Sequence, residues 1–118
     1  QMTSLMWAAY NGHVECTRLL IEAGSDVTAK SGRLKRTSLM LAAHNGHVEC
    51  ARLLIEAGSD VTAKDVSQRG QGYNGHLTSL MLAAIYGHVE CTRLLIEAGS
   101  DVTAKSDYRN TAKDLAQQ

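Results

Sequence analysis

The sequence predicts an all-α repeat solenoid, a fold in which short helical units stack in a row. The first observation is a 28-residue block that occurs three times, at residues 3–30, 37–64 and 78–105, with any two copies identical at 25 positions. The second is that each block holds two helical patterns, both shorter than the ~12–15 residues that an isolated helix needs in water. Such helices are stable only when each unit stacks on its neighbours, which is how a solenoid buries its core.

The first helix of each unit is predicted to begin after a threonine and to end at a glycine. In the first copy Thr3 is a favourable N-cap. Leu5, Ala8 and Ala9 then recur at the i, i+3, i+4 spacing of one buried helix face. Gly12 ends the helix, because glycine readily adopts the left-handed backbone found at helix C-termini.

The second helix is predicted over residues 14–22 and ends at Gly24. We expect Cys16, Leu19 and Leu20 to face inward, and the cysteines of the other two copies to occupy equivalent inward positions. The charged side chains of the same helix then lie on the opposite, solvent-facing side.

These units form a single domain over 1–118, with three full repeats and a partial fourth. The repeats span about 3–36, 37–77 and 78–110, the partial cap is 111–118, and the connectors between blocks have 6, 13 and 5 residues.

The middle connector, 65–77, is predicted to project as an extended finger loop. Its Asn74-Gly75 pair is a strong tight-turn signal, and Tyr73 and His76 flank it. The alternative is a tolerated insertion without a role, because long surface loops cost little stability.

The block resembles a known family in its recurring residues, Thr3-Ser4-Leu5-Met6, Ala8-Ala9, Gly12-His13, Leu19-Leu20-Ile21 and Gly24-Ser25-Asp26-Val27. The chain is similar to ankyrin repeat proteins over nearly its whole length. The resemblance implies helix-turn-helix units with hairpin connectors, and a concave binding surface made by the first helices and the hairpin tips.

Three departures from the family pattern are visible. Serine replaces the usual proline at Ser4 and its counterparts, and methionine replaces the usual histidine at Met6 and its counterparts. We expect the fold to survive both, since serine suits a helix start and methionine fills irregular gaps. No polar capping repeat precedes Thr3, which leaves the outer face of repeat one exposed and favours self-association.

Only four columns of the block differ between copies: Trp7/Leu41/Leu82, Tyr10/His44/Ile85, Asn11/Asn45/Tyr86 and Thr17/Ala51/Thr92. The first three columns share one face of the first helix and should form a continuous strip when the repeats stack. All five aromatic residues lie at varied or connector positions, and tyrosine and tryptophan dominate interface hot spots. The alternative is that Trp7 covers the bare end of the stack and that Leu41 and Leu82 are half-buried spacers.

The sequence therefore predicts a protein-recognition module, in which a partner protein contacts the varied helix faces and the loops. We interpret it as similar to engineered or library-selected ankyrin binders; the alternative is a natural scaffold that arose by recent repeat duplication. The predicted contact residues are Trp7, Tyr10, Asn11, Arg33, Leu34, Lys35, Arg36, Leu41, His44, Asn45, Arg69, Tyr73, Asn74, His76, Leu82, Ile85, Tyr86, Tyr108 and Arg109.

Charge describes the expected partner further. The chain carries 12 basic and 12 acidic residues, but each block sums to −1 while connector 31–36 supplies +3 through Arg33, Lys35 and Arg36. This polarity favours a partner with an acidic patch. The flat total argues against nucleic acid, and the Arg69–Tyr73 stretch is weak evidence for RNA binding.

Other functional classes are not supported. His13-Val14-Glu15 matches the His-x-Glu opening of the zinc deaminase motif, but the chain has no proline and no paired cysteines to complete that motif. The sequence shows no nucleophile–base–orienter set and no phosphate-binding loop, so we expect no metal, no cofactor and no enzymatic activity. No apolar run approaches the ~20 residues of a membrane span, and no signal segment is visible. Three unpaired cysteines suit a reducing compartment, and the cytoplasm if the protein is natural.

Overall fold

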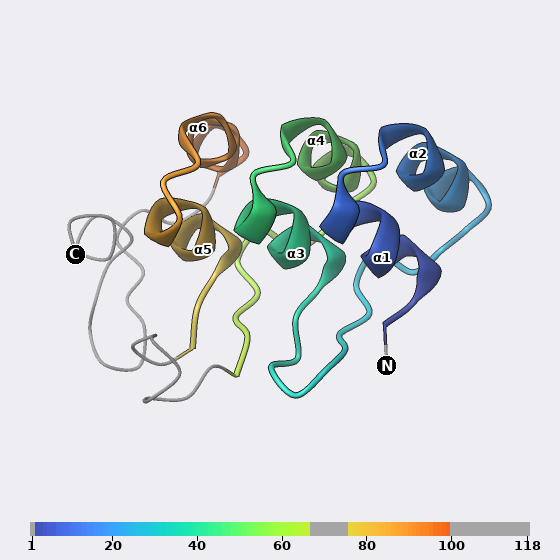
Figure 1. Cartoon of the computed structure of the whole chain (residues 1–118), viewed down its shortest axis with the longest axis horizontal. Helices are drawn as coiled ribbons and strands as arrows, with labels where there is room; N and C mark the ends of the chain where they lie inside the picture. Colours follow the sequence, from blue (N-terminus) through green and yellow to red (C-terminus); the bar gives the residue numbers. More distant parts are fainter. Residues whose placement is uncertain (1, 67–75, 100–118) are drawn as a thin grey trace.

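The computed structural model describes residues 2–66 and 76–99, which contain six helices (Figure 1). The helices alternate between two parallel rows, with the first helix of each repeat in one row and the second helix in the other. This arrangement confirms the predicted solenoid. No helix within the described ranges is long and apolar enough to cross a membrane. The helices are α1 (Ser4–Asn11), α2 (Val14–Glu22), α3 (Ser38–Asn45), α4 (Val48–Glu56), α5 (Ser79–Ile85) and α6 (Val89–Glu97).

The first helices begin as predicted, at a threonine cap. The hydroxyl oxygen of Thr3 accepts a hydrogen bond from the backbone N–H of Met6 at 3.2 Å, and Thr37 and Thr78 repeat this contact. The cap satisfies one of the backbone donors that every helix start leaves unpaired. The methionine at each cap is itself buried, so its flexible side chain fills the core at the position where the resemblance implies histidine.

The second helices differ from the prediction, because burial of a position depends on its repeat. Cys50 and Cys91 are fully buried, and burial raises the pKa of the Cys91 thiol to about 11. Cys16 is exposed, and Leu19 is 62% exposed. The cysteine side of each second helix faces the preceding repeat, and no described residue covers that side of α2. The expectation that all three cysteines lie inward is therefore wrong for Cys16, and Leu19 likewise faces solvent.

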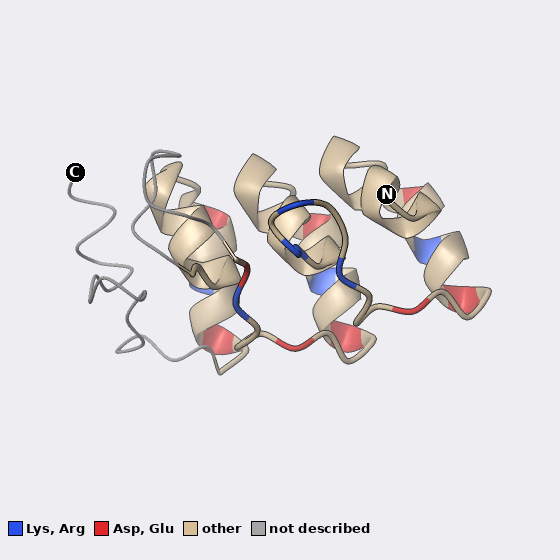
Figure 2. Cartoon of the chain, turned by 90° about the horizontal axis from the view of Figure 1, so that it is seen from below, with Lys and Arg blue, Asp and Glu red and all other residues tan. Residues whose placement is uncertain are grey.

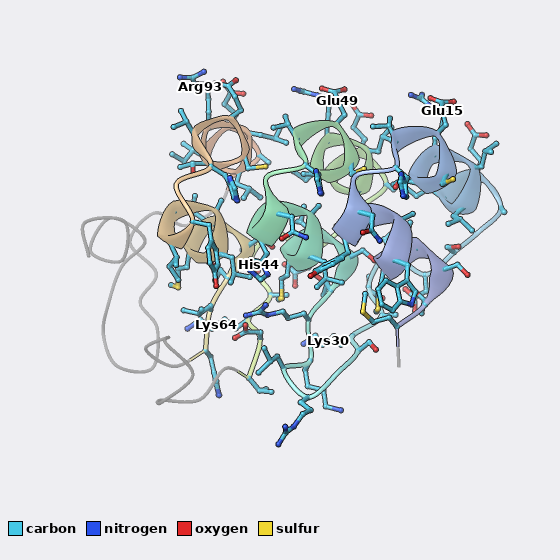
Figure 3. All side chains as sticks on the ribbon, in the orientation of Figure 1. Glu15, Lys30, His44, Glu49, Lys64 and Arg93 are labelled. Atoms are coloured by element: carbon cyan, nitrogen blue, oxygen red, sulfur yellow. The ribbon has the colours of Figure 1, made fainter. Side chains whose placement is uncertain are left out.

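The opposite side of each second helix faces the following repeat. Thr17 is fully buried, and its hydroxyl oxygen lies 3.4 Å from Cys50 Sγ. The Thr17 hydroxyl donates to the backbone oxygen of His13, so the threonine can occupy an apolar interface without an unpaired donor. The outermost charges pair along the solvent-facing edge of the second helices, as Glu15 does with Arg18 at 3.4 Å, and Figure 3 shows Glu15, Glu49 and Arg93 along this outer edge. Such exposed pairs stabilise a fold weakly.

A histidine of each following repeat packs on a glycine of the repeat before it. Gly46 ends α3 with a φ of 74°, and a Cβ placed there would lie 2.6 Å from Nδ1 of His88. The same contact joins Gly12 to His47. Glycine is therefore required at Gly12 and Gly46 both for its left-handed backbone and for the close approach of a ring from the neighbouring repeat.

The connector between the first two repeats is a hairpin. Ser31 and Arg36 exchange two backbone hydrogen bonds of 3.1 and 3.0 Å, and the four residues between them form the hairpin tip. The next connector starts beside it, because the N–H of Val66 donates to the oxygen of Leu34 at 2.7 Å. Residues 67–75 of the expected finger loop and the expected cap at 111–118 lie outside the described ranges.

Comparison of two single variants, Gly46→Ala and Gly87→Ala, tests whether the histidine contact stabilises the stack. Both glycines have nearly the same φ, 74° and 71°, so alanine should cost each about 1–2 kcal/mol in backbone strain. Of these two positions, Gly46 alone has a ring within 4 Å of the added Cβ, and this crowding should cost about a further 1–3 kcal/mol. Urea unfolding of both variants measures the difference, and equal losses would contradict the interlock.

Candidate binding surface

The exposed aromatic side chains lie on the first helices. Trp7 is 54% exposed and Tyr10 37%, although α1 buries its other side in the core, and Tyr86, the C-cap residue of α5, is 39% exposed. The rings of Trp7 and Tyr10 meet edge to face, with centroids 6.2 Å apart and planes at 88°. Exposure of rings this large leaves apolar area available for contact with another molecule.

Side chains from neighbouring repeats join at these positions. The side-chain amide of Asn45 donates to the backbone oxygen of Tyr10 at 2.8 Å, which links α3 to α1. The amide of Asn11 instead donates to the oxygen of Trp7 within its own helix, at 2.9 Å. The structure therefore brings together two of the varied columns across the first repeat boundary.

A second junction joins α3 to α5. The rings of His44 and Tyr86 lie 4.3 Å apart between centroids, with planes tilted by 34°. His88 Nε2 donates to the backbone oxygen of His44 at 2.9 Å, and Arg36 Nη1 lies 3.3 Å from His44 Nδ1. Burial, and then the charges of Arg36 and His88, lower the pKa of His44, so its Nδ1 is suited to accept from Arg36. Figure 3 labels His44 on α3.

These residues make one surface, which we call the first-helix strip. It crosses all three described repeats, and the two junctions above connect its parts. Its members are Trp7, Tyr10, Asn11, His44, Asn45, Ile85 and Tyr86, of which His44, Asn45 and Ile85 are half-buried.

Two of the contact residues predicted on the first helices do not lie on this surface. Leu41 is 9% exposed and Leu82 is fully buried, so the first varied column supplies a contact residue only at Trp7. A cavity of about 200 Å³ beside Leu41 is lined by residues of the 31–36 hairpin, which lies against this position. An apolar side chain next to the hairpin packs under it and does not reach a partner.

Arg36 is also misplaced by the sequence prediction. The sequence pattern places Arg36 with Arg33 and Lys35 on an exposed basic hairpin tip. In the structure, Arg36 is 7% exposed, and its Nε donates to Asp65 Oδ2 at 3.0 Å. The exposed charge of the tip is therefore that of Arg33 and Lys35, with Leu34 half-buried between them. Figure 2 shows basic segments gathered on this hairpin.

Asp65 is the residue that the sequence analysis missed. It is 1% exposed, and its other carboxylate oxygen accepts the N–H of Leu77 at 2.8 Å, so one side chain joins the two ends of its own connector to the preceding hairpin. The sequence carried a signal, because Arg36 ends one connector and Asp65 begins the next, both outside the repeated block. Opposite charges on adjacent connector arms indicate an ion pair.

The remaining predicted contact residues lie in or near the connectors. His76 is half-buried at the end of the middle connector. Five of the predicted residues lie outside the described ranges: Arg69, Tyr73, Asn74, Tyr108 and Arg109. Within 2–66 and 76–99, no three histidine, cysteine or acidic side chains are grouped so that they could hold a metal ion.

Comparison with known families agrees with the repeat architecture. A family model described as ankyrin repeats (3 copies) matches residues 1–65, and one described as ankyrin repeats (many copies) matches residues 66–116. The chain belongs to the ankyrin repeat family. Ankyrin repeats are generally non-enzymatic protein-interaction modules. A search of characterised proteins found no match to this chain.

The buried ion pair between neighbouring ankyrin connectors makes a testable prediction. Asp65→Asn keeps an acceptor for Leu77 but leaves the Arg36 guanidinium beside an uncharged group, and it should lower the free energy of unfolding by on the order of 3 kcal/mol. Asp60→Asn is the matched control, since Asp60 is exposed and accepts only local hydrogen bonds from Thr62. Urea unfolding of both variants gives the comparison, and a loss no larger for Asp65→Asn than for Asp60→Asn would show that the pair is not structural.

Proposed function

We propose that this ankyrin array recognises a partner protein through the first-helix strip and the exposed hairpin tip at Arg33 and Lys35. The observation that supports the proposal best is where the variation between repeats lies. The blocks differ in four columns, and the differing side chains that remain exposed include three large aromatic rings on one row of helices. Rigid aromatic side chains supply contact area at a low entropic cost.

The chemistry of this surface specifies a partner with two features. Trp7, Tyr10 and Tyr86 favour an apolar patch whose polar rim can bond the tyrosine hydroxyls. Arg33 and Lys35 are exposed on the tip and favour acidic residues beside that patch. With Arg36 paired to Asp65, the tip attracts with two exposed charges and acts chiefly on the rate of association.

We also propose that the surface positions were chosen on a uniform framework, as in an engineered or selected binder. The uniform framework and the restriction of differences to four columns support this origin. A natural scaffold formed by recent duplication is the alternative. If the surface was selected, the varied exposed residues of the first-helix strip should supply the binding energy. The exposed charged residues that recur on the second helices should not.

Substitution of the two helix rows separates binding residues from framework. The triple variant Trp7→Ala, Tyr10→Ala, Tyr86→Ala should weaken partner binding at least about 30-fold, because each ring is placed as an interface hot spot. The control triple, Arg18→Ala, Arg52→Ala, Arg93→Ala, removes exposed side chains of the outer row and should leave binding unchanged. Quantitative pull-down from a cell lysate with each variant, after circular dichroism has verified helix content, identifies partners that only the first triple loses.

Kinetics with a partner so identified tests the basic tip. Arg33→Glu combined with Lys35→Glu should slow association about tenfold at low salt, with a smaller effect as salt is added. Partners that persist with the aromatic triple, or that are lost equally with the outer-row triple, would refute the proposed surface.

A further inference from the structure

The two ends of the described solenoid expose apolar side chains on the second helices. At the α2 end, Leu19 is 62% exposed and Cys16 is also exposed. At the α6 end, Val89 is 65% exposed and Ile96 is 49% exposed. α2 and α6 lie at opposite ends of the same row in Figure 1. We call these surfaces the α2 end face and the α6 end face.

The interior of the chain shows what such faces pack against. Between α2 and α4, Thr17 of one repeat contacts Cys50 of the next, with Oγ1 and Sγ 3.4 Å apart and both residues fully buried. The outer rim of this boundary is a groove of about 220 Å³. Its lining comes from both repeats: Arg18, Ile21 and Glu22 on α2, and Leu53, Glu56 and Ala57 at the end of α4.

The same residues recur, exposed, at the two ends. The α6 end face carries Arg93, Ile96 and Glu97 at the positions that Arg18, Ile21 and Glu22 hold in the first repeat. The α2 end face carries Leu19, Glu22 and Ala23 at the positions of Leu53, Glu56 and Ala57.

Thr92 on α6 likewise corresponds to the buried Thr17, and the exposed Cys16 corresponds to Cys50. Each end face is therefore chemically one half of an interface that packs within the chain. The described α6 end face is also hollowed, with a cavity of about 450 Å³ lined by Val89, Thr92, Arg93, Ile96 and Glu97.

We propose that the α6 end face of one copy docks on the α2 end face of a second copy, with the second-helix side chains paired as they are between α2 and α4. The contact joins two different surfaces, so it is heterologous and leaves a free face at each end of the pair.

The proposal depends on the second helices and not on the first-helix strip. Trp7 stands at the α1 end of the stack where the equivalent residues are the buried Leu41 and Leu82, so the first helices of two copies do not reproduce the internal contact. Partner binding through the strip and self-association through the end faces use different side chains and fail independently.

Sedimentation velocity of the purified chain under reducing conditions tests the proposal, the reductant preventing disulfides through Cys16. Association should appear between about 1 µM and 1 mM, the range of weak protein contacts. Leu19→Glu and Ile96→Glu each place a charge on one end face at a position exposed in the monomer, and each alone should weaken association about tenfold or more. Arg33→Glu, on the hairpin tip, is the control and should associate as the unmodified chain does.

Mixing the two charged variants identifies the geometry. Leu19→Glu keeps an intact α6 end face and Ile96→Glu keeps an intact α2 end face, so the mixture should form one-to-one dimers and nothing larger. The proposal is overturned if the unmodified chain remains monomeric over the whole range, if either single variant associates normally, or if the mixture stays monomeric. Unchanged partner association in Arg33→Glu, with self-association also intact, would count against the proposed function alone.

Discussion

Contact between neighbouring repeats is the interaction on which the rest of this structure depends. No described helix exceeds nine residues, and only α4 among the described second helices packs against a repeat on each side. The same cysteine position is exposed in α2 and fully buried in α4 and α6, although the surrounding sequence is almost identical. Position in the stack, and not local sequence, therefore determines what is buried.

This constraint separates the residues that hold the array together from those free to change. The threonine caps, the Gly–His contacts and the apolar faces recur because every boundary needs them. The exposed side of the first helices is not packed in the core, so side chains there can differ between repeats without disrupting it. The buried pair of Arg36 and Asp65 lies outside the repeated block and fixes two adjacent connectors instead, which holds the hairpin tip beside the first-helix strip.

Sequence periodicity was sufficient for the fold class, the helix bounds and the capping threonines, because these follow from local spacing and glycine placement. It was also sufficient to group Tyr10, Asn45, His44 and Tyr86 on one face. It was insufficient where burial or pairing depends on a neighbouring unit: Leu41 lies under the adjacent hairpin, Arg36 pairs with the next connector, and Cys16 lies on a side of α2 that no described residue covers. These are contacts between units, and the pattern within one unit does not contain them.

Native-state hydrogen exchange resolved by helix tests the dependence on neighbours most directly. The three blocks have nearly the same sequence and so the same intrinsic helix propensity, which means that differences in protection report position in the stack. Exchange should be slowest in α3 and α4, which have a described repeat on both sides, and faster in α2 and α6. Equal protection of equivalent helices in all three repeats would contradict that dependence.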